Sequence, residues 1–389
     1  MNTSGYSSRS LFGFGSSSIG AYFLAMEIRV LSQGEQLEEI ESCWRQLHLS
    51  AINPELCSSW EWLYSWWLTY QEKDWQLQVI CVYAGQRLIA VAPYYYRGER
   101  SSRTLCLMGK GEPEEQEVCS EFVDLIVATG FQDEVIQLLA AYQEKEFRFV
   151  KKIELKQIEE DSLIAKLWVL SGFRICSKSC GIRYQLPLQS DLRDTLKSLP
   201  SNNLKKKTMR LLNHLRSERY NVKIFDTPDQ FDDAWSVLEN LHSERWASKG
   251  KSGAFISDKF RQFHKKYFQM ASTAGEAKIL TISGDKISAA IYCFYFKDRI
   301  YYYQSGFDSK ESGSLGIIAH LAVLDATSTG FKKYDFMCGG HQSYKSGWAR
   351  EQSRVVNVDA YPRTLIGQIR YWGYQLVGGL RVVRSSFLK

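Results

Sequence analysis

Two stretches decide the fold of this chain: VYAGQRLIAVAPYYY at Val82–Tyr96 and TISGDKISAAIYCFY at Thr281–Tyr295. In each, apolar residues run up to a short turn that contains glycine and then resume, which is the pattern of a β-hairpin. Gly85 and Gly284 stand at the same place in the two stretches, and small residues recur at Ala90 and Ala289. The two hairpins therefore indicate an internal repeat.

Similar elements surround both hairpins in a similar order. The first half is predicted to contain strands at 27–31, 76–83, 88–96, 122–127 and 152–155, helices at 35–47, 58–70, from 133 and at 163–171, and further strand up to 188. The second half is predicted to contain strands at 221–225, 277–282, 287–296, 299–306 and 333–337, and helices at 228–248, 257–271 and 315–327. This repeated order predicts two copies of one α+β fold, each a mixed sheet flanked by helices.

The repeat also predicts how the chain is divided. Residues 26–190 are expected to form the first domain and residues 221–360 the second, with a basic helical linker at 191–220. Residues 361–389 mix aromatic and apolar residues with arginines, and are expected to form a basic amphipathic helix that lies on an anionic membrane or closes the fold. Residues 1–25 are rich in Ser and Gly and do not resemble a signal peptide, so we expect a disordered leader or a start assigned too early.

Composition excludes several classes of function. Hydrophobic residues make up 44% of the 389 residues and charged residues 24%, which is typical of a folded globular chain. The net charge of +6 is too small to indicate nucleic-acid binding by itself. The nine cysteines form no CxxC pair and there is no HExxH motif, so no metal site is expected. No uncharged apolar run reaches about 18 residues, and the sequence predicts a cytoplasmic protein.

The segment that follows the strand at 299–306 is the strongest candidate for a ligand site. The strand leads into the loop SKESGSLG and then into an apolar helix that begins near Leu315. The backbone N–H groups and the positive dipole end of such a helix bind phosphate readily. Residues 312–316 are therefore a candidate cradle for a pyrophosphate, although the same residues also serve as simple helix caps.

Several further motifs lie around this loop. They are HxxRWxxxGxxGxF from His242, Phe263-His264, YYYQSGFD from Tyr301, DFxxGG from Asp335 and YKxxW from Tyr344. Together they resemble the GNAT-fold acyltransferases of the FemAB-like superfamily, and in particular the CelD-like group associated with cellulose and exopolysaccharide synthesis. The resemblance covers roughly residues 38–350. It implies tandem GNAT-like domains, with acetyl-CoA or another acyl-CoA as the donor and no metal.

The resemblance also implies roles for individual residues. Donor-binding candidates are Gln304, Ser305 and Gly306 on the strand and Ser312, Gly313, Ser314 and Gly316 in the phosphate loop, which only approximates the Q/RxxGxG/A pattern of GNAT enzymes. Catalytic candidates are Asp335 or His242 as the base, Lys345 to polarise the donor carbonyl or hold an anionic acceptor, and Tyr344 to protonate the leaving sulfur. Acceptor-binding candidates are Arg245, Trp246, His264 and Trp348.

Structural alternatives remain open for four of these residues. Asp335 is also suited to cap a turn or to pair with Lys345, His264 is suited to pack in a core, and Trp246 and Trp348 are suited to wall a site.

The sequence thus predicts an acyltransferase that modifies an amine or hydroxyl of a cell-envelope or exopolysaccharide precursor. Its partners would be a small-molecule or saccharide acceptor and polysaccharide-synthesis machinery at the inner membrane surface. One alternative is a FemAB-like peptidyltransferase that uses aminoacyl-tRNA, whose phosphates would bind the basic helix around Lys205–Arg219. Another is a non-catalytic accessory protein of polysaccharide synthesis.

Overall fold

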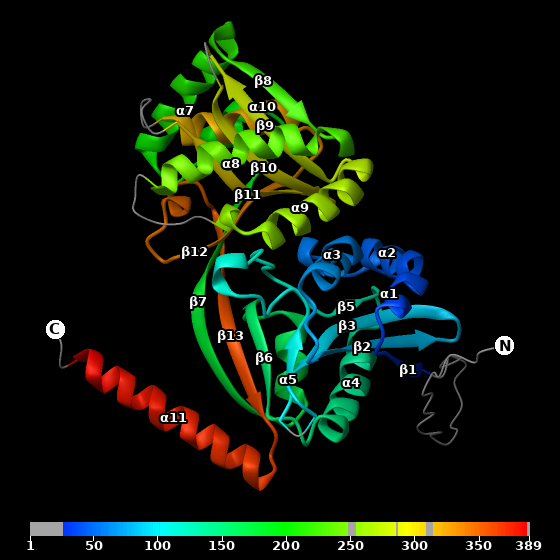
Figure 1. The fold of residues 1–389 in the computed structure, drawn as a ribbon. Coiled ribbons are helices and arrows are strands. Elements are labelled where there is room, and N and C mark those ends of the chain that lie inside the picture. Colours follow the sequence, from blue (N-terminus) through cyan, green and yellow to red (C-terminus); the bar gives the residue numbers. More distant parts are fainter. Residues whose placement is uncertain (1–25, 101, 248–253, 285–286, 309–313, 387–389) are drawn as a thin grey trace. The chain divides into compact units, whose positions relative to one another are not determined.

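The structure, a computed structural model, describes residues 26–386 except 101, 248–253, 285–286 and 309–313 (Figure 1). The side chains of residues 218–219, 245–247, 254, 287 and 377–386 also lie outside the described part, as does the leader predicted at 1–25.

The chain forms two compact units. Unit 1 takes the residues up to 111, residues 120–179 and those from 356 onward, and unit 2 takes residues 112–119 and 180–355. This division differs from the predicted boundaries, because segments far apart in the chain pair within one sheet. Unit 2 includes the basic segment expected as a linker, and unit 1 includes the carboxy-terminal helix.

Unit 1 is a mixed sheet with helices on both faces. Its strands are β1 (Met26–Leu31), β2 (Trp75–Ala84), β3 (Arg87–Arg97), β4 (Thr104–Leu107), β5 (Ile126–Val127), β6 (Lys152–Glu159), the start of β7 (Arg174–Pro187) and the end of β13 (Glu351–Tyr361). Its helices are α1 (Glu35–Glu39), α2 (Glu41–Ser50), α3 (Trp60–Tyr70), α4 (Gln132–Glu146), α5 (Leu163–Leu170) and α11 (Leu365–Ser386). The strand order is β1-β2-β3-β4-β6-β13-β7, and β4 and β6 are parallel.

Aromatic residues fix the helices of unit 1 on the sheet. The N-cap of helix α3 is Ser59, whose side chain accepts a hydrogen bond from the Trp62 backbone N–H. The ring of Trp66 packs on Tyr95 with ring centroids 5.4 Å apart. Tyr94, which directly precedes Tyr95 on β3, accepts a hydrogen bond from Trp168 of α5. Because neighbouring residues of a strand point to opposite faces, α3 and α5 cover opposite sides of this sheet.

Unit 2 has the same architecture. Its strands are the end of β7, β8 (Asn221–Phe225), β9 (Ala277–Ser283), β10 (Ile287–Phe296), β11 (Arg299–Phe307), β12 (Lys333–Gly339) and the start of β13. Its helices are α6 (Leu192–Lys197), α7 (Asn202–His214), α8 (Phe231–Ala247), α9 (Asp258–Ala271) and α10 (Leu315–Thr327), with π-helical and 3-10 turns at Leu215–Arg219 and Tyr344–Gly347. The strand order is β7-β12-β11-β10-β9-β8, with α8 and α9 on one face and α7 and α10 on the other (Figure 1).

The predicted repeat is confirmed by the strand pairing. In both units three antiparallel pairings are followed by one parallel pairing across a helical connection. Both hairpins also carry one extra residue at the same place, Ile89 in β3 and Ser288 in β10, each directly before the recurring alanine. The tandem α+β fold expected from the sequence is therefore present. Strands β4 and β13 were not predicted.

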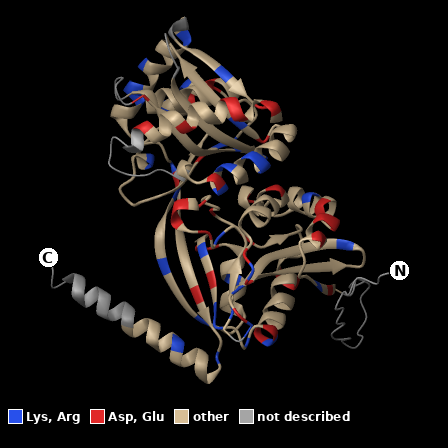
Figure 2. Cartoon of the chain, viewed as in Figure 1, with Lys and Arg blue, Asp and Glu red and all other residues tan. Residues whose placement is uncertain are grey.

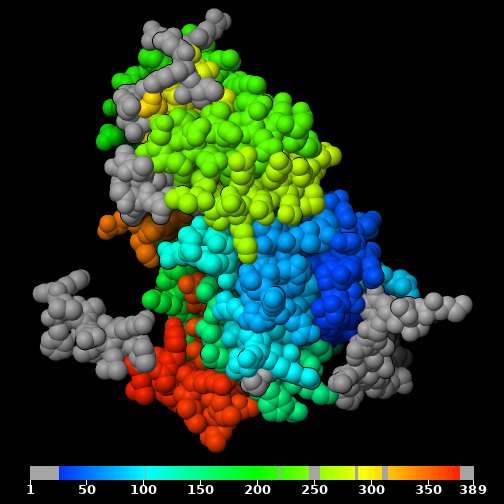
Figure 3. Space-filling view, in the orientation of Figure 1, coloured from blue at the N-terminus to red at the C-terminus, as the bar shows by residue number. Residues whose placement is uncertain are grey.

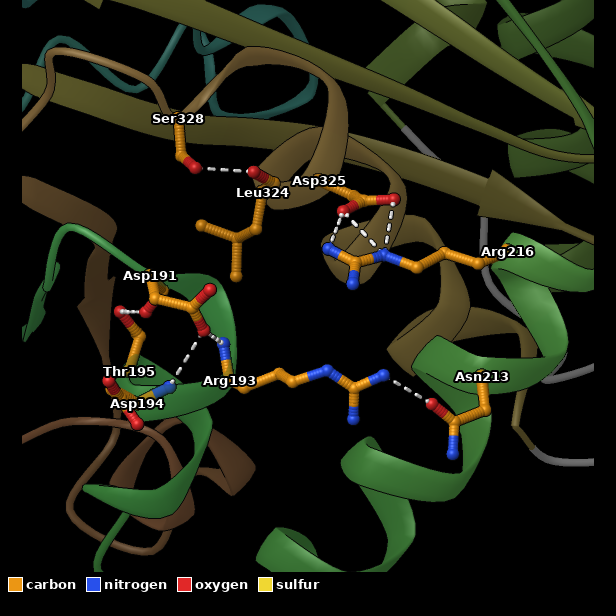
Figure 4. A network of polar contacts seen from close by, with 9 residues as sticks. All are labelled: Asp191, Arg193, Asp194, Thr195, Asn213, Arg216, Leu324, Asp325 and Ser328. Carbon is orange, nitrogen blue, oxygen red and sulfur yellow. Dashed lines mark hydrogen bonds and ion pairs between the residues drawn. The ribbon is translucent and has the colours of Figure 1, made fainter.

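The predicted basic linker is packed into unit 2. Leu211 and Leu212 of α7 are buried in the core beneath α10. Beyond them, the Arg216 guanidinium donates to the Asp325 carboxylate of α10 through Nε at 3.1 Å and a terminal nitrogen at 2.6 Å (Figure 4). Arg193 of α6 similarly donates to Asn213, so these helices are held together by polar bonds at their edges (Figure 4).

Within the described residues, no helix combines the length and the apolar character needed to cross a bilayer.

Candidate functional site

The central feature of unit 2 is the point where β11 and β12 separate. The parallel pairing between them joins Arg299–Tyr301 to Lys333–Asp335. Among the described residues it extends no further, although β11 continues to Phe307 and remains paired with β10. Beyond Tyr301 the two strands diverge, and the edge of β11 on that side is not paired with β12.

Asp335 stands at the apex of this divergence and is fully buried. Its Oδ2 accepts from Nε of Arg183 at 2.7 Å and from Nε2 of Gln185 at 2.8 Å, and its Oδ1 accepts from the Met337 backbone N–H at 2.8 Å. Met337 has a positive φ of 60° and lies in a bulge of the β12–β7 pairing. The carboxylate therefore holds the backbone where β12 turns away from β11.

These contacts bear on the predicted role of Asp335 as a base. The carboxylate is fully buried and is bonded to the buried Arg183 guanidinium, and breaking such a buried ion pair is costly. The geometry instead matches the capping alternative, with Arg183 and not Lys345 as the ionic partner. It favours Asp335 as a residue that positions β12.

Lys345 lies in the short helical turn after β12 and reaches back to that strand. Its Nζ donates to the backbone oxygens of Phe336 and Cys338, both at 2.6 Å. These carbonyls lie just past the last residue of β12 that pairs with β11, so the ammonium satisfies backbone acceptors near the opening. Charge-assisted bonds of this kind are stronger than neutral ones. Lys345 thus stabilises one wall of the divergence.

Helix α10 begins beside the other wall. Its N-cap is Ser314, whose side chain makes no capping bond, and its first turn contains no acidic residue. Gly316 lies in that turn, and a Cβ added there would come within 3.3 Å of the Phe307 ring at the end of β11. The helix start is therefore held close to the diverging strand. Of the predicted phosphate loop, Ser312 and Gly313 lie outside the described residues.

An aromatic cluster around His320 underlies the opening on the α10 face. His320 is buried, its Nδ1 lies 2.8 Å from the Tyr334 hydroxyl, and its ring packs edge-on against Tyr302 at 4.6 Å. Burial lowers the pKa of His320 to about 3, and the nearby Lys345 ammonium adds to the effect, so the ring is neutral at pH 7. The sequence reasoning missed this residue, although a single histidine in the apolar helix IIAHLAVLDAT was a usable signal.

Two predicted residues join this cluster. Trp348 is buried and packs on His320 and Phe336 with centroids 5.5 and 5.6 Å apart, so it forms part of the wall of the site. Tyr344 has its ring 6.4 Å from His320, and 58% of the residue is exposed. Tyr344 is thus the solvent-facing hydroxyl of the group.

The three residues of β11 predicted to bind the donor, Gln304, Ser305 and Gly306, have different surroundings. Gln304 is half-buried, and the Ser305 hydroxyl lies 2.8 Å from that of Tyr302. Gly306 is a packing position: a Cβ there would come within 2.5 Å of the His242 backbone nitrogen. Helix α8 crosses β11 at this point, which explains the glycine without a ligand.

The predicted histidines lie on the opposite face of the sheet from α10. His242 is buried in α8, with its ring 4.5 Å from that of Phe255. His264 of α9 is buried, and its Nε2 lies 2.9 Å from the Tyr303 hydroxyl. Burial lowers the pKa of His264 well below its usual value. This setting agrees with the packing alternative for His264. The side chains of Arg245 and Trp246 lie outside the described part of α8.

In the part of the chain that the structure describes, no group of three or more His, Cys, Asp or Glu residues is arranged to hold a metal ion.

Comparisons with known proteins agree with this geometry. Residues 202–346 match the acetyltransferase (GNAT) domain family. The crystal structure of FemX superposes with a TM-score of 0.57 and 13% identity, covering 82% of this chain and 95% of FemX. A conserved protein of unknown function from Bacteroides thetaiotaomicron VPI-5482 superposes with a TM-score of 0.51 and 12% identity, covering 85% and 99%. No curated protein matches the sequence significantly.

At such identities the structural likeness concerns the fold, and the CelD-like assignment stays a prediction. The domain match covers the diverging strands, α10 and Lys345. Residues 202–346 of this chain therefore match a GNAT acetyltransferase domain, within a chain of tandem α+β fold.

Proposed function

We propose that this protein transfers an acyl group from acetyl-CoA or another acyl-CoA to an amine or hydroxyl, with the donor bound between β11 and β12. The observation that carries the proposal is the separation of these strands beside the start of α10 within a GNAT domain. The pantetheine arm of the donor would lie in the opening between the two strands. The thioester of the donor would supply the activated acyl group.

The start of α10 would bind the pyrophosphate of the donor. This helix is 13 residues long, lacks a side-chain cap at Ser314 and has no acid in its first turn. Its first N–H groups and its dipole would therefore attract an anion. Because Gly316 has no side chain, the start of α10 can lie close to Phe307, and no side chain at this position would block the N–H groups of the first turn.

The reaction itself needs a nucleophile held against the thioester carbonyl. The acceptor oxygen or nitrogen would form a bond to the carbonyl carbon, the carbon–sulfur bond would break, and the acceptor proton would pass to a base. Tyr344 is suited to return a proton to the leaving thiolate. Asp335 and Lys345 would act by holding β12, and His242 remains the alternative candidate for the base.

The acceptor is proposed to be a cell-envelope or exopolysaccharide precursor. The support is the sequence resemblance to envelope-associated acyltransferases and the exposed Tyr344 at the open end of an aromatic-walled site. Aromatic walls such as Trp348 and Phe336 suit the apolar faces of a saccharide or of the pantetheine arm.

Donor binding tests the proposal directly. Calorimetry with acetyl-CoA, a longer acyl-CoA and CoA is expected to give micromolar affinity for the purified protein. Ser314→Asp introduces a negative charge at the start of α10, and should weaken binding at least tenfold while leaving the helix capped. Ser314→Asn is the neutral control with a similar cap and should retain the affinity within about twofold.

Absence of binding to all three compounds would refute the acyl-CoA donor and favour aminoacyl-tRNA or the non-catalytic alternative. Equal affinity in Ser314→Asp and Ser314→Asn would refute the phosphate site at α10 while leaving donor binding itself intact.

A further inference from the structure

Helix α11 of unit 1 carries a continuous apolar stripe on its outer side. Leu365, Ile369, Trp372 and Leu376 follow one another at intervals of three or four residues, and these side chains therefore share one face of the helix. Leu365 is 77% exposed, and the other three are exposed as well. In the view of Figure 3 the red segment of α11 lies at the surface.

The other side of α11 is attached to unit 1. The rings of Tyr371 and Tyr374 pack on Tyr361 at the end of β13, with centroids 6.2 and 6.3 Å away. Gln375 donates to the sulfur of Cys176 in β7 at 3.4 Å. The helix is thus held by one face and presents the apolar stripe on the opposite face, as an interfacial helix does.

The charge of the segment is of one sign. From residue 360 to the end the chain contains Arg363, Arg370, Arg381, Arg384 and Lys389 and no Asp or Glu. The described part of α11 accordingly shows blue and no red in Figure 2. An apolar stripe that includes Trp and is flanked only by cations is complementary to an anionic lipid surface.

Further cationic and exposed aromatic side chains lie near the start of α11. Arg370 donates to the backbone oxygen of Lys151 at 3.3 Å, and two residues before Lys151 lies Phe149, which is 76% exposed. The Arg148 guanidinium lies 4.7 Å from the Phe149 ring. A hollow of about 430 Å³ opens here, lined by Lys145, Arg148 and Arg363 together with the single acid Glu144. This cationic hollow is suited to a lipid phosphate.

We infer that unit 1 docks on an anionic bilayer surface through α11, with the apolar stripe in the interface and the cations near its start on the headgroups. Phe149 enters the same interface from the turn between α4 and β6. This docking is independent of the donor site in unit 2 and of the acceptor chemistry.

The test is sedimentation of the full-length protein with vesicles. Vesicles of phosphatidylcholine with 30% phosphatidylglycerol are expected to bind the protein, and vesicles of phosphatidylcholine alone at least tenfold more weakly. Ile369→Ser combined with Trp372→Ser should lower binding to the anionic vesicles at least tenfold. Leu49→Ser, at an exposed leucine of α2 in the same unit, is the matched control and should bind like the wild type.

A variant that removes two cations tests the electrostatic contribution separately from that of the apolar stripe. Arg363→Gln combined with Arg370→Gln should weaken binding several-fold and reduce its dependence on salt. Failure of the wild-type protein to bind anionic vesicles would overturn the inference. So would a vesicle-free dimer, measured by analytical ultracentrifugation, that dissociates in the Ile369→Ser, Trp372→Ser variant, because a second copy would then cover the stripe. Since Ile369, Trp372 and Leu49 are exposed, thermal unfolding should be unchanged in the serine variants.

Discussion

Units 1 and 2 share one fold but differ at the two places that the proposed donor site would use. In both, a parallel pairing of three residues ends at an acid, Glu154 in unit 1 and Asp335 in unit 2. Past that point in unit 1, the buried Lys110 donates from its Nζ to Gln157 of β6, so a side chain bridges the diverging strands. In unit 2 the lysine that follows the divergence, Lys345, bonds to the backbone of β12 itself.

The helices after the divergence differ as well. Helix α4 of unit 1 has Asp133 and Glu134 in its first turn, whereas α10 of unit 2 has no acid there. Acidic side chains at a helix start stabilise the helix but repel a phosphate from the same N–H groups. Both units therefore contain diverging parallel strands followed by a helix. The charges at the start of that helix make unit 2, and not unit 1, suited to the proposed anionic donor.

The largest expected effect is on the free energy of unfolding, and it should differ between variants of Asp335 and of Glu154. Asp335→Asn should lower the free energy of unfolding by about 3–5 kcal/mol, because it removes the carboxylate that pairs with the buried Arg183 guanidinium. Glu154 is more accessible and has several partners. Burial opposes its ionisation, but bonds to Lys152 and Lys156 still hold its pKa at about 2. Glu154→Gln should therefore cost roughly 1 kcal/mol. Urea denaturation measures both, and equal losses would contradict the distinction.

A smaller loss of stability is expected from a substitution at the point where α8 crosses β11. Gly306→Ala places a methyl group against the His242 backbone, which cannot move without shifting the helix. The cost should be about 2 kcal/mol in urea denaturation. Gly340→Ala is the control in the same unit, since a Cβ there meets no atom within 4 Å. If both variants were equally stable, Gly306 would be assigned to ligand binding instead of packing.

Lys345 should affect the donor site more than overall stability. Lys345→Met keeps the aliphatic stem but removes the bonds to Phe336 and Cys338, so the end of β12 loses its support. Affinity for acetyl-CoA is expected to fall about tenfold by calorimetry, equivalent to roughly 1.4 kcal/mol. Lys333→Met, which removes an exposed ion pair with Glu351 in the same unit, should leave the affinity unchanged. Wild-type affinity in Lys345→Met would argue against its support of the opening.

The last expected effect is a dependence of stability on pH. His320 has a pKa of about 3 in the folded protein because of burial, against about 6.5 in an unfolded chain. Between these values the unfolded chain binds one more proton at this site, so the free energy of unfolding falls as the pH is lowered. The contribution is up to about 1.4 kcal/mol per pH unit.

Urea denaturation from pH 7 to pH 4 should show this slope in the wild type and a smaller slope in His320→Gln. Tyr334→Phe removes the hydrogen bond but keeps the histidine, and should retain the slope. A wild-type slope in His320→Gln would contradict the assignment.

Much of the fold was predictable because its signals are local. The apolar alternation of the two hairpins, the Ser59 cap of α3 and the glycine turns are each written in fewer than about 20 consecutive residues. Strand β4 escaped prediction because it is four residues long. The boundaries of the units were not accessible in the same way, since residues 356–361 join unit 1 only through pairing with strands that lie far earlier in the chain.

The candidate site was predictable only in part. The sequence indicated the segment, the aromatic motifs and Lys345, but not what each side chain touches. Asp335 and Arg183 are 152 residues apart in the chain, and no local pattern shows that one is the counter-ion of the other. Nor does the spacing of His242 and His264 reveal that both pack on the face of the sheet opposite His320.

By itself, then, the amino-acid sequence determined the order of helices and strands, their duplication and the motifs that resemble GNAT acyltransferases, because periodicity and turn chemistry act between near neighbours. The tertiary structure alone decided where β11 and β12 separate, which acid holds the apex and which backbone oxygens Lys345 binds. These features arise from contacts that depend on how the chain folds in space. Their energies depend on burial, and burial exists only once the sheet and its helices have formed.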